Sequence, residues 1–433
     1  MSMEQTKQHQ SKWTIPFFTI WIGQAFSLIG SRVAQFALVW WLTRLTGSAT
    51  VLATATMVAL IPEIFLGPIA GAYVDRWNRR IVIIVADGVI ALASLWLAYL
   101  FWTDAMQVWH VYVIMLVRSV GGSFHWPAMQ ASSSLMIPKE HLSRVAGLNQ
   151  TMNGALNIVG PPLGALLMEV LPLYGVMLVD VGTAMLAILP LLFVHVPQPR
   201  RDDMGAEKPT IWADMREGLR YIRDWPGLMV LIGAAMIFKI ALTPAFSLLP
   251  LLVSKHFNGG AAQLSLLESV AGVGIVVGGI ILSVWGGFRR KIYTTMMGMV
   301  VLSLGFVVLG LTPGGLFWIA LASIFVVGLM IPLIDGPIMA ILQGTVAPEI
   351  QGRVFTLMGS LLWMTSPFSL AIAGPVSDWL GLQVWYVAAG VLCGATGLAC
   401  FFVPAIVNIE QNHNGHAIAE REVPVTVPAH VTE

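Results

Sequence analysis

Residues 71–80 read Gly-Ala-Tyr-Val-Asp-Arg-Trp-Asn-Arg-Arg, a charged segment where two long apolar runs, 47–74 and 80–101, meet. Each run is longer than the about 20 residues that an α-helix needs to cross a bilayer. Because charge and irregular backbone are stable only outside the hydrocarbon, we interpret residues 71–80 as the connection between two membrane-spanning helices. The rest of the chain repeats this pattern.

The composition supports a membrane protein. Hydrophobic residues make up 57% of the 433 residues and charged residues 10%, whereas soluble chains have about 45–50% and about 25%. The sequence therefore predicts an all-α membrane protein with twelve transmembrane helices. The predicted spans are 14–41, 47–74, 80–101, 109–136, 144–170, 174–195, 226–253, 264–287, 291–311, 316–346, 353–379 and 381–405.

The distribution of basic residues predicts the orientation. Lysine and arginine are retained on the cytoplasmic side, and with both termini inside, 18 of the 23 fall there, against only Arg44 and Lys255 outside. The longest interior connection, 196–225, separates two halves that each carry two prolines eleven residues apart. We predict a cytoplasmic tail (1–13), a six-helix bundle (14–195), a cytoplasmic linker (196–225), a second six-helix bundle (226–405) and a disordered cytoplasmic tail (406–433).

Several classes of function are disfavoured. The formal net charge of +1 indicates no nucleic-acid partner. Cys393 and Cys400 are seven residues apart, two turns of one helix, which is too far for a disulfide. The sequence contains no phosphate-binding loop, no H-E-x-x-H zinc motif and no G-x-S-x-G nucleophile motif. We therefore expect no enzyme, no metal site and no bound cofactor.

The connection at 71–80 resembles the signature loop of the major facilitator superfamily. The residues that carry the resemblance are Gly71, Asp75, Arg76, Arg79 and Arg80. A glycine allows two helices to approach closely, and an aspartate can accept hydrogen bonds from a helix N-terminus, so the loop is a candidate gate. The family has glycine where this chain has Asn78, and asparagine tolerates the left-handed backbone of such a turn. The alternative is a solvated loop with ordinary cytoplasmic charges.

Residues 118–122, Arg-Ser-Val-Gly-Gly, resemble a second motif of the superfamily, in which a buried arginine lies near the proton-coupling acid. Placing a charged side chain at mid-membrane costs at least about 2.5–3.5 kcal/mol on insertion scales, so such a residue usually has a function. Arg118 is therefore a candidate for proton coupling. The alternative is a structural ion pair inside the first bundle.

Residues 154–164 resemble the antiporter motif of the superfamily, which Gly154, Gly160, Pro161 and Gly164 carry. Proline bends a helix, and glycines permit tight packing against a neighbouring helix. In the family this motif accompanies exporters, so the resemblance implies export. A plain helix kink is the alternative.

Ionisable residues inside the spans are candidates for proton transfer. They are Arg32, Glu63, Asp87, Arg118, Lys239 and Asp335. Glu63 lies nearest to mid-depth, and since burial favours the neutral form of a carboxyl group, it is our first candidate proton carrier. Asp87 and Asp335 are reserves. The alternative is that each acid permanently neutralises a basic partner.

Polar residues form stripes on two spans. On the fifth span they recur every four residues, and on the first they recur at similar helical spacing. In a water-filled cavity such stripes bind substrate hydroxyls, and in a dry interface they join helices, so both readings stay open. The predicted substrate cavity comprises Gln24, Ser31, Arg32, Gln35, Asn149, Asn153, Asn157 and Lys239.

The resemblance covers nearly all of residues 12–405, and stretches such as 118–127 and 352–355 look like the macrolide-efflux branch of the drug:proton antiporters. It implies a monomeric transporter of two pseudo-symmetric six-helix bundles in a bacterial plasma membrane. Such a protein exports small hydrophobic or amphiphilic, macrolide-like molecules, with the proton gradient as its energy source and membrane lipid as its surroundings. Two alternatives remain open: export of an endogenous amphiphile such as a siderophore or lysophospholipid, and a transport-inactive membrane sensor or scaffold.

Overall fold

The computed structural model describes residues 3–74, 76–194, 196, 198, 211–346 and 348–410. In these ranges the regular elements are all helices. They are α1 (Met3–Thr46), α2 (Ala49–Val74), α3 (Arg79–Trp102), α4 (Val108–Met136), a 3-10 turn (Lys139–His141), α5 (Leu142–Val170), α6 (Leu173–Phe193), α7 (Ile211–Asp224), α8 (Pro226–Ser247), α9 (Leu249–Leu251), a π-helical turn (Leu252–His256), α10 (Ala261–Trp285), α11 (Lys291–Leu311), α12 (Phe317–Thr345), α13 (Pro348–Leu380), α14 (Leu382–Phe401) and α15 (Pro404–Val407).

Ten helices in the described ranges are long and apolar enough to cross a membrane. They are α1, α2, α3, α6, α8 and α10 to α14. A helix satisfies all its backbone hydrogen bonds internally, which is why lipid-embedded chain takes this form. The protein is therefore an all-helical integral membrane protein. Helices α4 and α5 have 29 residues each but contain no stretch apolar enough to count among these ten, so exactly twelve crossings stay a prediction.

Some helix ends differ from the predicted spans. Helix α1 begins at Met3 rather than at 14, because hydropathy marks where a helix leaves the lipid and not where its hydrogen bonding ends. The predicted linker, 196–225, contains the 14-residue helix α7. Of the predicted tail 406–433, residues 411–433 lie outside the described ranges.

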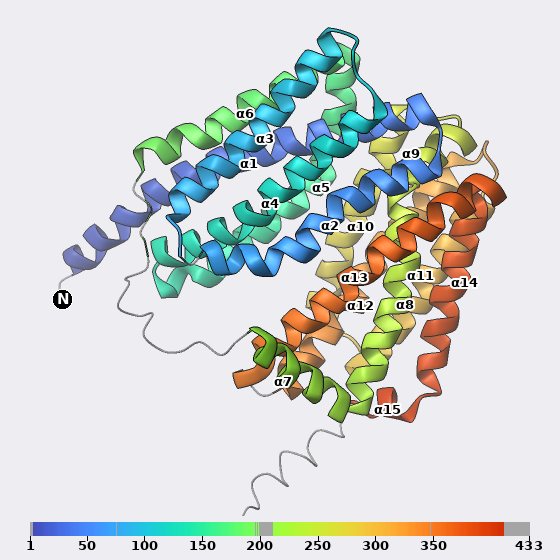
Figure 1. Ribbon diagram of the computed structural model, residues 1–433. Helices are drawn as coiled ribbons and strands as arrows, with labels where there is room; N and C mark the ends of the chain where they lie inside the picture. Colours follow the sequence, from blue (N-terminus) through green and yellow to red (C-terminus); the bar gives the residue numbers. More distant parts are fainter. Residues whose placement is uncertain are drawn as a thin grey trace, which may run out of the picture.

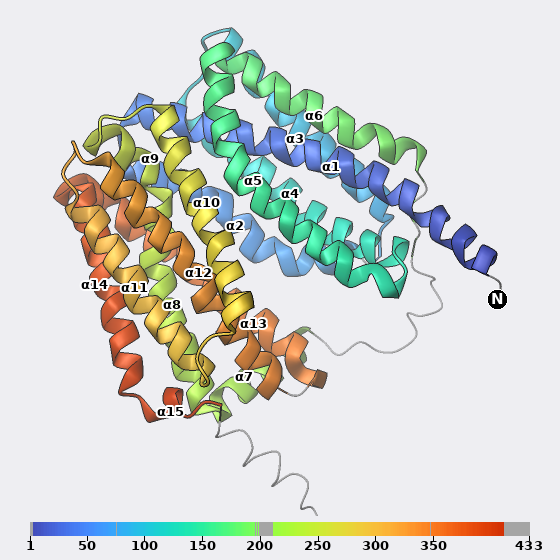
Figure 2. The same ribbon diagram turned by 180° about the vertical axis from the view of Figure 1, so that it is seen from behind.

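The long helices form two groups. In Figures 1 and 2, α1 to α6 lie together on one side and α8 to α15 on the other. Within the groups, α1 packs on α6 and α3 on α4, while α11 packs on both α12 and α14. Between the groups, α2 packs on α13 and α5 on α10. The groups meet at the end that carries α9 and diverge toward the end that carries α7 and α15 (Figure 1); we call these the closed end and the open end.

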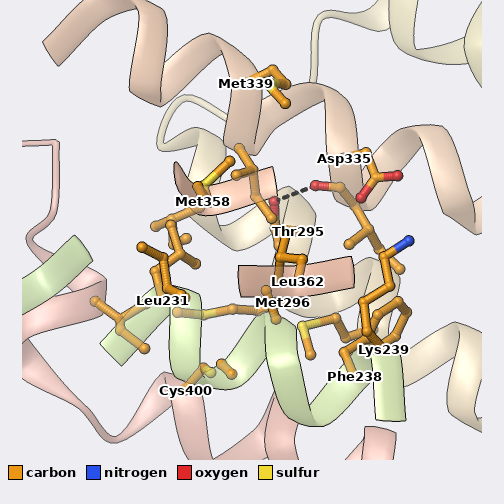
Figure 3. A pocket seen from close by; sticks show the side chains of 18 of the residues that line it. Leu231, Phe238, Lys239, Thr295, Met296, Asp335, Met339, Met358, Leu362 and Cys400 are labelled. Atoms are coloured by element: carbon orange, nitrogen blue, oxygen red, sulfur yellow. Dashed lines mark hydrogen bonds between the residues drawn. The ribbon is translucent and has the colours of Figure 1, made fainter. Parts of the chain in front are cut away.

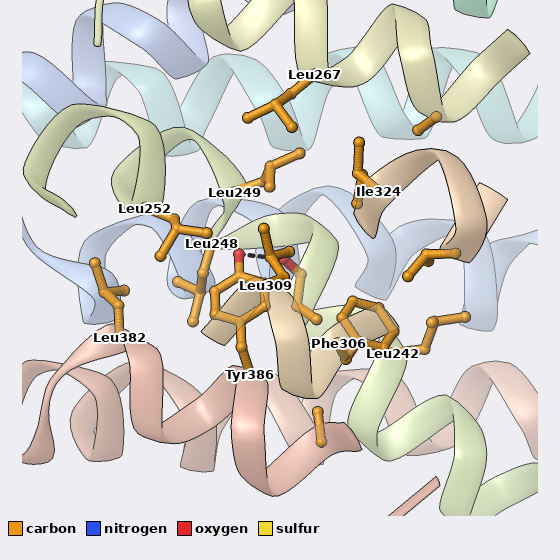
Figure 4. Packing of buried hydrophobic residues seen from close by; sticks show 14 of the residues in the cluster. Leu242, Leu248, Leu249, Leu252, Leu267, Phe306, Leu309, Ile324, Leu382 and Tyr386 are labelled. Carbon is orange, nitrogen blue, oxygen red and sulfur yellow. Dashed lines mark hydrogen bonds between the residues drawn. The ribbon is translucent and has the colours of Figure 1, made fainter. Parts of the chain in front are cut away.

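The second group has a continuous apolar core near the closed end, where Leu248, Leu309 and Phe306 surround Tyr386 (Figure 4). The Tyr386 side chain is fully buried, and its hydroxyl donates to the Ala245 carbonyl oxygen at 2.7 Å. A buried tyrosine needs such a partner. This bond ties α14 to α8.

Candidate functional site

Two polar networks lie inside the first group. In the first, the Gln24 side chain donates to Asp87 Oδ2 at 2.8 Å. His125 Nε2 lies 3.2 Å from Asp87 Oδ1 and 3.0 Å from Gln24 Oε1. Because Asp87 is buried, these contacts replace the water that its carboxylate would otherwise need. The network joins α1, α3 and α4.

The second network centres on Arg118 and Asp180. Arg118 Nη1 lies 2.6 Å from Asp180 Oδ2, with side-chain exposures of 12% and 1%. The Ser94 hydroxyl donates to Asp180 Oδ2 at 2.6 Å and accepts from Arg118 at 2.7 Å, while the Ser31 hydroxyl donates to Asp180 Oδ1 at 3.0 Å. Removing one partner of a buried pair leaves an uncompensated charge, which is strongly destabilising. Arg118 therefore has a fixed structural partner.

The two networks form a ladder. Each of three helices contributes one residue to the first network and another, seven residues or two turns away, to the second. The pairs are Gln24 and Ser31 on α1, Asp87 and Ser94 on α3, and His125 and Arg118 on α4. Asp180, on α6, was missing from the predicted set of charges inside the spans. A lone aspartate within the apolar run of α6 was the signal that sequence reasoning passed over.

A cavity of about 330 Å³ lies between the two groups. Arg32 and Gln35 of α1 and Asn157 of α5 line it from the first group, and Glu268 of α10 lines it from the second. Within the described residues Arg32 and Glu268 form no direct ion pair, although the charge of Arg32 acts on the Glu268 carboxylate. Opposite charges thus face one space from opposite walls. Glu268 is the second intramembrane acid that the sequence analysis missed.

The glycines of the α5 motif set the wall of this cavity. A Cβ atom at Gly164 would lie 2.9 Å from the Phe36 ring, and one at Gly160 would lie 3.2 Å from the Arg32 Cβ. The absence of side chains therefore lets α5 pack closely on α1 at Arg32. Pro161 lines the cavity itself. Gly154, by contrast, is in ordinary contact distance of Val276 at 3.9 Å.

The other predicted cavity residues lie elsewhere. Lys239 lines a different pocket, inside the second group, together with Asp335. Asn149 accepts a hydrogen bond from Trp21 Nε1 at 2.8 Å. Gln24 and Ser31 belong to the ladder, and Asn153 lines neither cavity. The structure therefore brings together only Arg32, Gln35 and Asn157 of the predicted set.

Glu63 is exposed on α2 and forms no ion pair with any other described residue. It lies seven residues after Thr56, whose hydroxyl is 2.6 Å from that of Ser247 on α8. Residues seven apart share one face of a helix. Glu63 thus lies on the α2 face that approaches the second group, toward the open end.

The predicted gate at 71–80 takes a different form from the expected one. Asp75 lies outside the described residues, and Arg76 is exposed. A Cβ at Gly71 would meet nothing within 4 Å, so the expected close helix approach is not made in this structure. Asn78 is extended (φ −68°), not left-handed, because its side chain caps α3 by accepting from the Ile81 N–H.

The basic pair of this loop binds backbone carbonyl groups of the first group. Arg79 is buried and donates to the Ala131 carbonyl oxygen at 2.6 Å. Arg80 donates to the carbonyl oxygens of Leu191 and Leu192 near the end of α6. Cations stabilise the C-terminal ends of helices. These two arginines therefore attach α3 to α4 and α6.

Asp378 joins the two groups at the closed end. From the end of α13, its carboxylate accepts hydrogen bonds from the backbone N–H groups of Ala49 (2.7 Å) and Thr50 (2.9 Å). The Ser48 hydroxyl donates to it at 2.8 Å. An anion here satisfies the free N–H groups at the start of α2. Sequence reasoning missed this residue because its partners lie about 330 residues away.

No group of three or more His, Cys, Asp or Glu side chains in the described ranges is arranged to hold a metal ion. Four charged or polar side chains, of Arg32, Gln35, Asn157 and Glu268, instead face one cavity between two membrane-embedded groups of helices. That arrangement defines a class of protein, a membrane transporter with its site between two halves.

The comparisons with known proteins agree with this class. Residues 20–368 match the model of the Major Facilitator Superfamily, and the chain belongs to that superfamily. It is 31% identical over 400 residues to macrolide efflux protein A of Streptococcus pyogenes, covering 92% of this chain and 98% of that protein. It is 24% identical over 396 residues to the multidrug efflux pump Tap of Mycolicibacterium fortuitum, covering 88% and 94%.

The fold is also similar to that of solved transporters. A bacterial homologue of the human lysosomal transporter Spinster, in an inward-facing and unoccupied conformation, aligns with a TM-score of 0.70 over 93% of this chain and 98% of that one. The two sequences are 12% identical, so this likeness concerns the fold alone.

Proposed function

We propose that this protein exports hydrophobic and amphiphilic drug-like molecules, including macrolides, in exchange for protons. The observation that carries the proposal is the cavity between the two groups, with Arg32 on one wall and Glu268 on the other. A site at this interface can be exposed alternately to each side of the membrane if the groups rock against each other. The macrolide and multidrug efflux proteins to which the chain is similar supply the substrate class.

The proposed architecture is a monomer with twelve crossings in two six-helix bundles, and with both termini in the cytoplasm of a bacterium. In this orientation the open end faces the cytoplasm, so the cavity is placed to receive substrate from inside. The basic residues of the loop at 71–80 and of α7 then lie on the cytoplasmic side, as the positive-inside rule requires. No cofactor is needed, because the proton gradient drives export.

Glu63 is the proposed proton carrier. A carrier must gain and lose a proton in each cycle, so a carboxylate without a fixed cation suits this role better than one held in an ion pair. Among the described residues Glu63 has no ion-pair partner, while Asp180 is held by Arg118. Asp87 and Asp335 remain the reserve candidates. In this proposal Arg118 stabilises the first bundle through its ion pair with Asp180.

Transport by purified protein in liposomes tests the proposal. With an imposed pH gradient, a radiolabelled macrolide should accumulate above the level in empty liposomes, and a protonophore should abolish the accumulation. Macrolide flux that is independent of protons would contradict the coupling. Liposomes that move neither drug nor lipid under any gradient would contradict transport itself.

A variant of Glu63 tests the assignment of the carrier. Glu63→Gln preserves size and removes the titratable group, so it should abolish drug-driven proton movement while macrolide binding stays measurable. The matched control is Glu169→Gln, which makes the same change at an exposed residue at the end of α5. Proton movement in Glu63→Gln equal to that in the control would remove Glu63 from the mechanism.

A further inference from the structure

A second cavity, of about 280 Å³, lies wholly inside the second group, between α8 and α11 to α15. Its lining is apolar apart from Lys239, Asp335 and Thr295, and the Thr295 hydroxyl is already bonded to the Ile334 carbonyl oxygen at 3.1 Å. Figure 3 shows Lys239 and Asp335 at one side of this cavity and Leu231 and Cys400 at the other. The two charged groups thus lie at the same side of the cavity.

Burial changes from one side of the cavity to the other. Met339 and Trp363, which line it near Lys239 and Asp335, are 43% and 49% exposed. Leu231, Met296 and Cys400 are 5% exposed or less. The cavity therefore has an open mouth with two opposite charges and a buried apolar interior.

The interior suits an apolar chain. Large apolar cavities stay dry, and an unfilled cavity costs stability, so filling it with an apolar group is favourable. Four methionines line this one: Met296, Met299, Met339 and Met358. Methionine is unbranched and flexible, so its side chains adapt to chains of different shape.

The mouth suits a headgroup that carries both charges. Lys239 Nζ lies 5.4 Å from the centre of the Trp363 ring, a cation–π contact that leaves its N–H groups available to a ligand. Asp335 is exposed, and the positive charge of Lys239 acts on its carboxylate, but the two side chains form no direct ion pair. An anionic oxygen can therefore bind Lys239 while an ammonium group binds Asp335.

We propose that this cavity is a binding site for single-chain zwitterionic amphiphiles, with the chain inside and the headgroup between Lys239 and Asp335. It is separate from the cavity that Arg32 and Glu268 line, because no residue is shared between the two linings. The site does not depend on macrolide export. The ligand is either a resident membrane lipid or a transported molecule, since both offer the same chemistry.

Native mass spectrometry of the intact purified chain tests the site. The probes are lauroyl lysophosphatidylethanolamine, dodecanol as a chain without charge, and glycerophosphoethanolamine as a headgroup without a chain. We expect the lysophospholipid to bind most tightly. Lys239→Gln should raise its Kd at least about tenfold, the factor that about 1.4 kcal/mol produces, and should leave dodecanol binding unchanged.

A second variant fills the interior. Ala235→Phe places a ring in the cavity and should weaken both probes that carry a chain. The matched controls are Lys255→Gln and Ala371→Phe, which make the same changes at exposed residues outside the cavity. The proposal is overturned if each cavity variant binds the probes as its control does.

The role of the ligand follows from transport of the same probe. Movement of lysophosphatidylethanolamine across proteoliposomes would make it a substrate, and binding without movement would make it a resident lipid. Both outcomes support the site. Failure of macrolide export would leave this binding test unaffected.

Discussion

Replacement of Asp378 should shift the balance between the two access states that the proposed transport cycle requires. Its carboxylate, at the end of α13, holds the start of α2 through the N–H groups of Ala49 and Thr50 and the hydroxyl of Ser48. These bonds exist only while the closed end is shut, because they cross between the two groups. Asp378→Ala therefore destabilises the described state and leaves the opposite state without that loss.

The size of the shift follows from the capping geometry. Loss of an N-cap acceptor costs about 0.5–2 kcal/mol, and loss of an anion at an exposed helix N-terminus costs about 0.3–1 kcal/mol. Because Asp378 is largely exposed, solvent screening reduces its charge interaction, and the total of these two costs lies in the lower part of its range. We expect a change of about 1–2 kcal/mol, which is a factor of roughly 5–30 in the equilibrium between the states. Asp378→Asn should shift it less, since asparagine still caps helices.

The distance between two spin labels, measured by pulsed electron paramagnetic resonance, can detect this shift. Ala105→Cys and Leu316→Cys place labels at exposed positions of the two groups at the closed end. The native Cys393 and Cys400 are buried and unpaired, so they compete little for the label. Asp378→Ala should add a population with longer distances.

Either of two distance results would refute the role of Asp378 in closure, and a third would refute the capping argument. One is an unchanged distance distribution in Asp378→Ala, which would mean that the capping bonds contribute nothing to closure. The other is the same change in Glu169→Ala, a control at the same end of the molecule that makes no contact between the groups in the described ranges. A larger effect of asparagine than of alanine would also contradict the capping argument.

The remaining predictions concern stability. Arg118→Gln and Asp180→Asn should each lower the melting temperature in detergent, because each leaves a buried charge unpaired at a cost of about 3–5 kcal/mol, and the double variant should recover part of the loss. Equal and additive losses would contradict the ion-pair interpretation. Gly164→Ala should cost about 1–3 kcal/mol through overpacking against Phe36, whereas Gly154→Ala, with 3.9 Å available, should melt close to the unchanged protein.

Much of the fold is predictable because hydropathy reports the lipid environment directly. The predicted span 291–311 coincides with α11, and 174–195 differs from α6 by only one or two residues at each end. Helix α1 is the largest difference, since it extends eleven residues beyond its predicted start, into polar sequence. Whether α4 and α5 cross the membrane is harder to predict, because the residues that serve the interior also lower their hydropathy.

The site was less predictable, because it depends on which helices meet. Arg32 and Gln35 belong to a visible polar stripe, and they do line the interface cavity. Asp180 and Glu268 are single acids in apolar runs, and their surroundings come from other helices. Local sequence carries no record of such partners. Asn78 was misjudged for a related reason: a cap and a left-handed turn favour the same residue type.

The seven-residue ladder has a consequence for motion. Helices α1, α3 and α4 of the first group are joined at two levels, and α6 is joined to them at one, by hydrogen bonds and an ion pair. Bending any one of these helices would therefore break contacts with the others. The helices joined in this way therefore move as one rigid body. If the two groups rock against each other as proposed, the displacement is concentrated at the contacts α2–α13 and α5–α10. There the motion must break the hydrogen bonds of Asp378 to the start of α2 and the bond from the Ser269 hydroxyl to the Ile158 carbonyl oxygen.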